Sequence, residues 1–244
     1  NEERLSHAQK SMSPLFGYSN SGDGYYPDGS FIQHGNIPYN GSYGYVLLDE
    51  LTNCIIMLSF SDYAIDREDI TFYENTLLHH YIPFLSHGGN MVDSVRGRAV
   101  SRKSQQGDTM GMQTMGILLQ YADAAATAST REAIYQQLKG IATSKFKQSQ
   151  SEDFSLLAYA DYMRVKNLVN HDAYPAMSRN SFSVYSFMDR IVTHRENFTF
   201  TLAANSARMC TEQGNSENLL GRYQGQGYTQ IYNDDINQYN EDYH

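Results

Sequence analysis

The chain has 244 residues, of which 41% are apolar and 13% aromatic, and its formal charge is -9 at pH 7. This composition supplies a sizeable core and excludes a disordered chain. The negative charge argues against a general binder of nucleic acid or anionic membranes, because phosphate binding needs a concentrated basic face.

The first half of the sequence predicts a loop region followed by two helices. Residues 1–42 are rich in Gly, Ser, Asn and Pro, which is typical of an ordered loop region. Over residues 45–60 the apolar side chains recur at helical spacing, so we expect a buried helix there. A second helix is expected over residues 66–82, because Pro83 cannot continue it.

The middle of the chain predicts a polar loop and three further helices. Residues 86–106 are polar and rich in arginine, which favours a loop. An apolar stripe over about residues 108–126 predicts a helix. Capping-box patterns, Ser-x-x-Glu, begin at Ser129 and at Ser149, and we expect a helix to start at each.

After Asn170 the apolar period changes from that of a helix to that of a strand. The segments SFSVYSF and NFTFTLAA alternate apolar and polar residues, which predicts half-buried antiparallel strands. Phe198, Phe200 and Leu202 are expected on the apolar face. Helices first and sheet second predict an α+β fold with segregated layers or domains, joined near residues 170–180.

One candidate site lies in the stretch DGSFIQHGNIPYNGSYGY, where His34 and Tyr43 precede a buried helix. Histidine exchanges a proton near neutral pH, whereas tyrosine does so only where cations or donors stabilise its phenolate. The pair would suit removal of a weakly acidic proton and protonation of a leaving oxygen. A hydrogen-bonded structural pair is the alternative, and the spacing alone does not decide between them.

Positive charge is concentrated in the arginine-rich loop, where Arg96, Arg98, Arg102 and Lys103 lie close together in a chain with 18 basic residues in all. Guanidinium groups hold carboxylates and sulfates in a fixed plane. An anionic ligand is therefore one interpretation of this loop. The other is a structural cluster paired with Asp93 or other carboxylates.

A third candidate segment, CTEQGNSENLLGRY, carries Glu212, Asn215, Glu217 and Asn218. These side chains are suited to binding sugar hydroxyls or to orienting an arginine. An ordinary polar turn around Gly214 is the alternative.

Several other kinds of site find no support in the sequence. His79 and His80 are adjacent and no HxxxH or CxxC pattern occurs, so no metal site is expected. Cys54 and Cys210 are far apart and are expected to be free buried thiols rather than a disulfide bridge. No phosphate-binding glycine loop and no serine nucleophile elbow is present.

Four separated motifs resemble those of polysaccharide lyase family eight, the group of hyaluronate, chondroitin AC and xanthan lyases. They are DGSFIQHGNIPYNGSYGY, RGRAVSR, MDRIVTHRENFTFTLAANSARMCTEQGNSEN and GYTQIYND, and the resemblance runs from about residue 24 to the end. It implies the end of an incomplete α/α toroid over residues 1–172. The start of an antiparallel β-sandwich domain would follow over residues 173–244.

The same resemblance implies which residues act. The family histidine falls on His34 and the family tyrosine on Tyr43, with Tyr45 as second choice. Tyr43 as phenolate would remove the C5 proton of a uronic acid and return it to the leaving oxygen. His34 would share the role of base, or hold the uronate carboxylate and polarise Tyr43.

The family's arginine pair falls on Arg98 and Arg102, its acid on Glu212 and its amide on Asn215. Arg98 would stabilise the phenolate of Tyr43, and Arg102 with Glu212 would fix its orientation. Asn215 would contact the sugar or support the loop. A further family asparagine would come from a helix upstream of this chain.

The resemblance thus predicts a secreted or cell-surface lyase that cuts hyaluronan or chondroitin by β-elimination. We expect an acidic polysaccharide and the remaining part of the same polypeptide as partners, no nucleic acid, no membrane and no cofactor. The alternatives are xanthan lyase activity, a non-catalytic polysaccharide-binding fragment, and a glycoside hydrolase. The last needs two carboxylates flanking the bond, for which Glu212 and Glu217 are too near each other in sequence.

Overall fold

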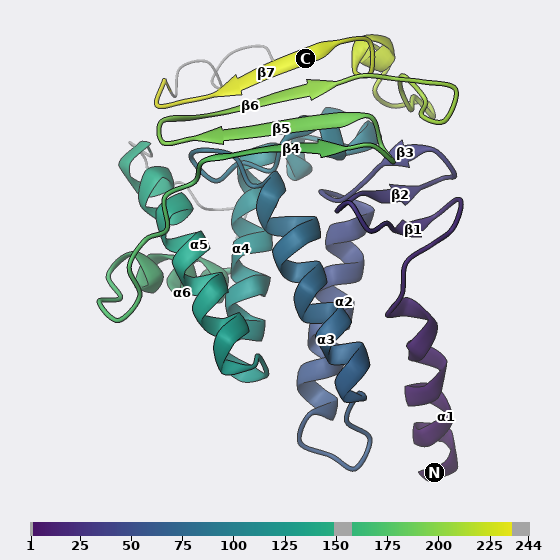
Figure 1. Ribbon diagram of the computed structural model, residues 1–244, viewed down its shortest axis with the longest axis vertical. Helices are drawn as coiled ribbons and strands as arrows, with labels where there is room; N and C mark the ends of the chain where they lie inside the picture. The colour runs from purple at the N-terminus through teal and green to yellow at the C-terminus, as the bar shows by residue number, and fades with distance from the viewer. Residues whose placement is uncertain (1, 149–157, 236–244) are drawn as a thin grey trace.

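The computed structural model describes residues 2–148 and 158–235 and confirms the predicted α+β class. Figure 1 shows the helices side by side, with a sheet lying across one end of them. The α-helices are α1 (Glu2–Met12), α2 (Tyr43–Leu58), α3 (Arg67–Thr76), α4 (Gly107–Ala124), α5 (Ala128–Gln148) and α6 (Tyr159–Val169). No helix in this part of the chain combines the length and the apolar character that crossing a membrane requires.

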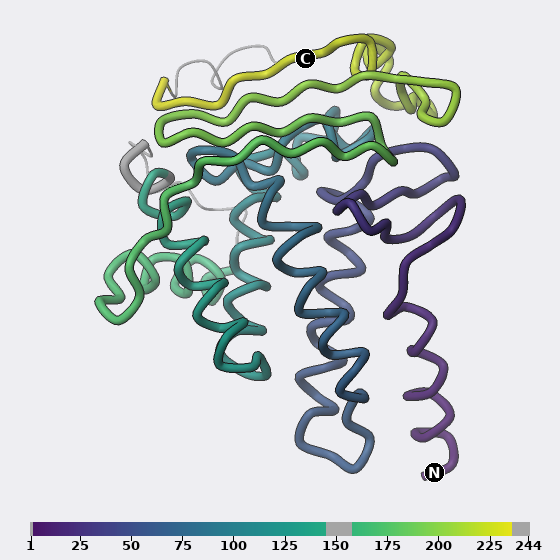
Figure 2. The backbone as a smooth tube through the Cα atoms, viewed as in Figure 1, coloured from purple at the N-terminus to yellow at the C-terminus, as the bar shows by residue number. Residues whose placement is uncertain are grey.

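Two antiparallel sheets accompany the helices. The small one joins β1 (Gly24–Tyr25), β2 (Phe31–Gln33) and β3 (Ile37–Pro38) in that order. The larger one has the order β4 (Ser181–Tyr185), β5 (Arg190–Arg195), β6 (Phe198–Ala203) and β7 (Tyr228–Tyr232). Figure 2 traces the chain from α1, whose free end lies far from the larger sheet, through the helices into that sheet.

The loop region predicted over residues 1–42 is wrong in part, because α1 and the small sheet lie within it. The two helices predicted before the arginine-rich loop are both present. The first, α2, begins at Tyr43 rather than at residue 45, so the candidate tyrosine lies in its first turn. The second, α3, continues into a π-helical turn over Leu77–Tyr81 and a 3-10 turn over Ile82–Phe84. Helical backbone therefore runs through Pro83, which lies at the start of the last turn, where its missing N–H is not needed.

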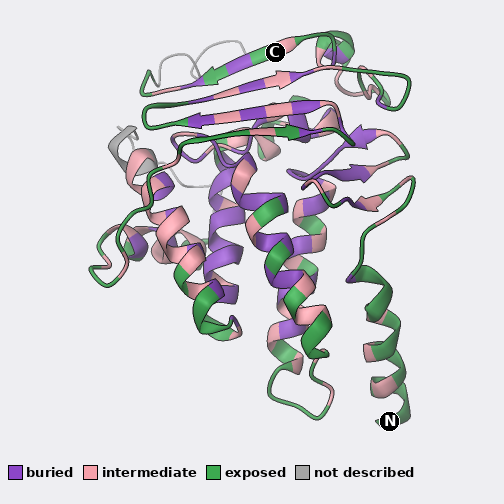
Figure 3. Cartoon of the chain, viewed as in Figure 1, coloured by how far each residue is buried: buried purple, intermediate pink, exposed green. Residues whose placement is uncertain are grey.

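The helix predicted near residues 108–126 is α4, and it is the centre of the helical layer. It packs against α2, α5 and α6, and most of its residues are buried on all sides (Figure 3). The next helix begins at Ala128, so the prediction of a cap at Ser129 is wrong. Instead Thr127 Oγ1 accepts the backbone N–H of Thr130 at 3.4 Å. The pattern at Ser149 lies outside the described residues.

The arginine-rich loop folds into three short 3-10 turns between the helices and the larger sheet. These are Asp93–Val95, Gly97–Ser101 and Lys103–Gln105. Its backbone is tied to the helical layer at several points, for example by the bond from Met91 N to Gly107 O at 2.7 Å. Such ties make the loop a firm support for its arginines.

In β6 the predicted alternation is confirmed, but the expected buried face is wrong. Thr199 and Thr201 are buried against the helical layer, whereas Phe198 lies on the outer face and is 37% exposed. The reason is polar: the backbone N–H of His87 donates to Thr199 Oγ1 at 2.7 Å, a bond that phenylalanine cannot accept. Phe182 of β4 is also exposed on that outer face.

A buried polar cluster, here the junction cluster, joins the loop to the larger sheet. It consists of Asp93, Arg96, Gln230 and Tyr232. Arg96 Nε donates to Asp93 Oδ1 at 3.0 Å, and Gln230 Nε2 donates to Asp93 Oδ2 at 2.7 Å. The backbone N–H of Asp93 donates to Tyr232 Oη at 3.1 Å, and that hydroxyl donates to Gln230 Oε1 at 2.7 Å.

Candidate active site

His34 lies at the tip of the turn between β2 and β3, and its backbone has a left-handed φ of 54°. This conformation is uncommon for a residue with a Cβ and costs on the order of 1 kcal/mol. The turn is fixed by Gly35, whose φ is 81° and whose N–H donates to Asp23 Oδ1 at 2.6 Å. The strained turn presents the exposed imidazole at the edge of the molecule.

Tyr43 stands close to His34 because the buried Asn40 folds the intervening segment back on itself. The Asn40 side chain donates to Gly29 O at 3.0 Å and to His80 O at 2.8 Å. The ring centroids of His34 and Tyr43 are 4.9 Å apart. The sequence motif therefore forms one compact group rather than an open loop.

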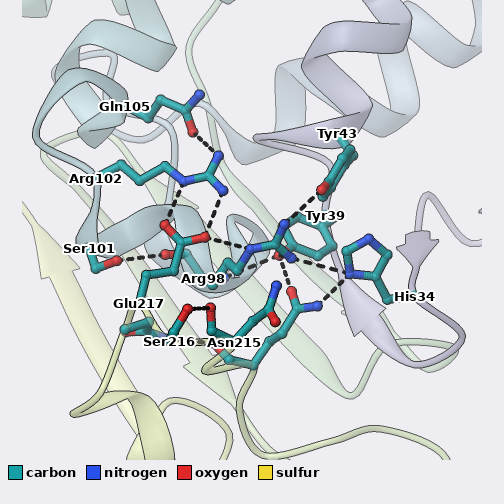
Figure 4. Close-up of polar contacts among 12 residues, drawn as sticks. His34, Tyr39, Tyr43, Arg98, Ser101, Arg102, Gln105, Asn215, Ser216 and Glu217 are labelled. Atoms are coloured by element: carbon teal, nitrogen blue, oxygen red, sulfur yellow. Dashed lines mark hydrogen bonds and ion pairs between the residues drawn. The ribbon is translucent and has the colours of Figure 1, made fainter.

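Arg98 is the centre of the site, and Figure 4 shows side chains from three other segments turned toward it. Its Nη2 donates to Tyr43 Oη at 2.8 Å, and its Nη1 approaches His34 Nδ1 at 3.3 Å. Gly97 permits this approach, because its φ is 50° and a Cβ there would meet the Tyr39 ring at 2.2 Å. The guanidinium is thereby held against both candidate proton carriers.

Glu217 holds both arginines from the side of the larger sheet. Arg98 Nε donates to Glu217 Oε1 at 2.6 Å, while Arg102 Nε and Nη2 donate to its Oε2 and Oε1 at 2.9 and 2.7 Å. The hydrogen bonds from Arg102, followed by those from Arg98, lower the pKa of Glu217 to about 2. Because two guanidinium groups surround one carboxylate, these three side chains together carry a net positive charge.

The structure corrects the expected partner of the arginines. Glu212 is exposed and makes no hydrogen bond or ion pair with any described residue, so it does not orient Arg102. It lies instead beside a small cavity that Ile37 and Arg190 also line. Glu217, which the sequence offered as one of several polar residues, occupies the expected place.

Asn215 and Tyr45 have different surroundings from those of the central group. Asn215 is exposed on the same loop as Glu217, has a left-handed φ of 53° and accepts a bond from Ser216 Oγ on its carbonyl. Burial, and then the carboxylates of Asp49 and Asp161, raise the pKa of Tyr45 to about 12. A phenolate is therefore disfavoured at Tyr45, and Tyr43 is the better candidate.

Sequence reasoning missed two members of the group. Tyr39 is fully buried, and its Oη receives bonds of 3.3 Å from both the backbone N–H and the Nη1 of Arg98. Gln213 accepts a short hydrogen bond from Tyr39 Oη and lies in hydrogen-bond contact with His34 Nδ1. Tyr39 could have been singled out, because it lies in the same motif as His34 and Tyr43. No sequence pattern indicates Gln213. We call these seven residues the Arg98 cluster: His34, Tyr39, Tyr43, Arg98, Arg102, Gln213 and Glu217.

The Arg98 cluster combines a phenol, an imidazole and fixed positive charge at a partly open surface. A cation hydrogen-bonded to a phenol favours its ionised form, and the remaining positive charge suits an anionic ligand. Within the described residues, no group of three His, Cys, Asp or Glu side chains is arranged to hold a metal ion. The phenol, the imidazole and the positive charge of the cluster are suited to proton transfer next to an anion.

Comparison with known protein families gives two matches that together span most of the chain. Residues 1–139 match the model described as polysaccharide lyase family 8, N terminal alpha-helical domain. Residues 180–244 match the model described as polysaccharide lyase family 8, super-sandwich domain. Their order is that of the helices and the larger sheet.

Individual proteins show the same similarity. The chain is 34% identical to a xanthan lyase of Bacillus sp. (strain GL1) and 31% identical to the hyaluronate lyase HylB of Enterococcus faecalis, over 94% and 98% of its length. It spans about a quarter of each of these relatives, 24% in both cases.

Two solved structures have the same fold as this chain. The structure of a Paenibacillus xanthan lyase superposes with a TM-score of 0.87 at 28% identity, covering 97% of this chain and 22% of that one. A Streptomyces coelicolor A3 chondroitin AC lyase in complex with chondroitin sulphate gives a TM-score of 0.84 at 28% identity, covering 95% and 32%.

Proposed function

The chain belongs to polysaccharide lyase family 8, and from this premise we propose that it supplies catalytic residues to a lyase that cleaves hyaluronan or chondroitin by β-elimination. One observation carries the proposal: Arg98 Nη2 donates to Tyr43 Oη at 2.8 Å beside His34. The whole enzyme would be a longer polypeptide, in which the helical part ends near residue 172 and the sandwich part begins near residue 173. Its polymeric substrate implies that it acts outside the cell.

In this mechanism Tyr43 is the base. The C5 hydrogen of a uronic acid is weakly acidic because the adjacent carboxyl group takes up the developing charge. Arg98 Nη2 donates to Tyr43 Oη and is proposed to hold this oxygen in place as the base. The phenolate removes the C5 proton, the bond from C4 to the glycosidic oxygen breaks, and Tyr43 returns the proton to that oxygen. The product carries a double bond between C4 and C5.

His34 has a different task. Two nitrogens that donate, Arg98 Nη1 and Gln213 Nε2, lie next to its Nδ1, so that atom is the acceptor. The proton of the neutral ring is then on Nε2, which has no lone pair to offer as a base. We propose that this N–H donates to the uronate carboxylate and so stabilises the charge that develops during proton removal.

Arg102 and Glu217 are proposed to keep Arg98 in place rather than to exchange protons. Glu217 stays ionised because both arginines donate to it, so it is a poor general acid. This argues against the hydrolase alternative, which needs a protonated carboxyl group and a second carboxylate. Asn215 and Glu212 lie on the same segment, exposed, and are proposed to contact sugar hydroxyls.

Xanthan lyase activity is the second candidate, because a xanthan lyase of Bacillus is 34% identical to this chain and a Paenibacillus xanthan lyase superposes with a TM-score of 0.87. Both candidates use the same elimination and differ in the polymer that the cleft accepts. A binding fragment without turnover is the remaining alternative.

The unsaturated product gives a direct test, because it absorbs in the ultraviolet and a hydrolase product does not. We expect the full-length protein to generate this absorbance with hyaluronan or chondroitin sulfate, and xanthan is the comparison substrate. Tyr43→Phe should lower the rate by about 10³-fold, since it removes the acid and base of the reaction. Tyr45→Phe, in the same turn of α2, is the matched control and should retain the rate. Full activity of Tyr43→Phe would refute the assignment.

A further inference from the structure

Gln213 connects His34 and Tyr39, two residues of the stretch DGSFIQHGNIPYNGSYGY, although it lies more than 170 positions later in the sequence. Its Oε1 accepts the hydroxyl proton of Tyr39, and its Nε2 lies against Nδ1 of His34. In Figure 4 dashed lines reach one ring nitrogen of His34, and this is Nδ1, the atom that Arg98 Nη1 and Gln213 Nε2 contact. Gln213 and Arg98 thus contact the same nitrogen of His34.

Arg98 determines which group donates in each hydrogen bond of the series that runs through Tyr39 and Gln213 to His34. The backbone N–H and Nη1 of Arg98 are obligatory donors, and both point at Tyr39 Oη from 3.3 Å. Tyr39 Oη accepts these bonds, and its own proton goes to Oε1 of Gln213. The amide is thereby oriented with its NH₂ group toward His34, which places a donor at Nδ1.

We propose that Tyr39 and Gln213 are positioning residues that select the tautomer of His34 carrying its proton on Nε2. The order of the hydrogen bonds is Arg98 to Tyr39, Tyr39 to Gln213, and Gln213 to His34. The catalytic consequence rests on the proposed lyase function, because only the Nε2–H tautomer donates to an anionic substrate. The opposite tautomer would turn a lone pair toward that anion, which is repulsive.

The tautomer is measured directly by the ¹⁵N chemical shifts of the two ring nitrogens in protein labelled at histidine, since a bare and a protonated nitrogen differ widely in shift. His34→Gln assigns the signals among the 8 histidines. At a pH where the ring is neutral, we expect Nδ1 of His34 to be bare and Nε2 to be protonated. A wild-type His34 with a protonated Nδ1 would overturn the proposal.

Gln213→Glu keeps the size of the side chain and replaces the donor at His34 by an acceptor. We expect Nδ1 of His34 to become protonated in this variant. In the full-length enzyme, kcat should fall by roughly 100-fold, because the electrostatic stabilisation is misplaced. Gln226→Glu is the matched control, since Gln226 is exposed in a nearby loop and the change in charge is the same. Unchanged His34 shifts in Gln213→Glu would overturn the proposal.

Tyr39→Phe tests the same chain of bonds from its other end. Without the hydroxyl the amide of Gln213 is no longer oriented, so we expect a mixture of both His34 tautomers and an intermediate loss of kcat. A single Nε2–H tautomer in this variant would refute the role of Tyr39. These tests distinguish failure of the tautomer proposal from failure of the lyase proposal. Wild-type protein that has the expected shifts but forms no unsaturated product contradicts only the lyase assignment.

Discussion

Two polar clusters link the arginine-rich loop to the segments that follow the helices, and they differ in what their arginines contact. Arg96 in the junction cluster is 1% exposed, and its donors end on Asp93 and on the backbone carbonyl of Gln105. Arg98, two positions later, contacts side chains from three distant segments. The sequence presents both arginines in the same way, within VRGR.

The comparison shows how one loop serves both structure and chemistry. The acceptors of Arg96 are the carboxylate of Asp93 and the backbone carbonyl of Gln105, both on the same loop, so its bonds hold the fold together. Two of the acceptors of Arg98 are Tyr43, which we propose as the base, and His34, which we propose as a donor to the substrate, and both lie at a partly open surface. The junction cluster ties the same loop to the larger sheet.

The largest effect is expected from Arg98→Lys. One ammonium group cannot bond Tyr43, His34 and Glu217 at once, so the phenolate loses its stabilisation. Product absorbance in the full-length enzyme should fall by about 10³-fold, equivalent to about 4 kcal/mol. The free energy of unfolding should change by no more than about 1 kcal/mol. Arg222→Lys, on an exposed arginine, is the control, and a wild-type rate in Arg98→Lys would contradict the role of Arg98.

Asp93→Ala should lower the stability of the protein and leave its rate nearly unchanged, the opposite of Arg98→Lys. It leaves the buried guanidinium of Arg96 without its carboxylate and removes the acceptor of Gln230. Breaking one side of a buried ion pair costs about 3 kcal/mol. Urea unfolding should show this loss, whereas the rate per folded molecule stays near that of the wild type. Asp62→Ala, on an exposed acid, should change neither quantity. A stability unaffected by Asp93→Ala would remove the distinction between the clusters.

Much of the fold was predictable because it depends on local periodicity. The helices α2 and α4 and the strand β6 follow from the spacing of apolar residues. The buried face of β6 was not predictable, because it depends on the hydrogen bond that Thr199 accepts from the backbone N–H of the distant His87. Spacing shows that a strand has two faces, but the partner decides which face is buried.

The same limit applies to the candidate site. His34, Tyr43, Arg98 and Arg102 were found by motif and come together. Glu217 was not singled out from its neighbours, because the loop that carries it has left-handed residues at Asn215, Ser216 and Asn218. These turns redirect the chain, so spacing does not show which of two nearby acids reaches the arginines.

Acid should weaken the junction between helices and sheet before it weakens the Arg98 cluster. His194 of β5 links the larger sheet to the helical part, because its Nε2 contacts the carbonyl of Pro83 at 2.8 Å. Burial, and then the charge of Arg179, lower the pKa of His194 to about 3. Between pH 6.5 and 3 the unfolded chain therefore binds a proton that the folded chain does not, so stability falls as the pH falls. From pH 7.5 to 5 the loss is about 2 kcal/mol.

Glu217 affects stability in a lower pH range. Because its pKa is depressed, its contribution to the free energy of unfolding is present above about pH 4.5 and is lost toward pH 2. Urea unfolding at pH 7.5 and 5 measures the first window. His194→Gln should make stability depend less on pH there, and Glu217→Gln should not. Equal slopes for wild type and His194→Gln would contradict the assignment to His194.

The smallest expected effect on stability compares two single hydroxyl groups, one from each cluster. Tyr232→Phe removes the acceptor of the Asp93 backbone N–H and the donor to Gln230, and should cost about 1 kcal/mol of stability. Tyr43→Phe removes a hydroxyl bonded by Arg98 at a partly open surface, and should cost less than half as much. Activity should respond in the reverse order, nearly unchanged in Tyr232→Phe. If both variants lost stability and activity together, the two clusters would form one cooperative unit, and the division between holding and reacting would fail.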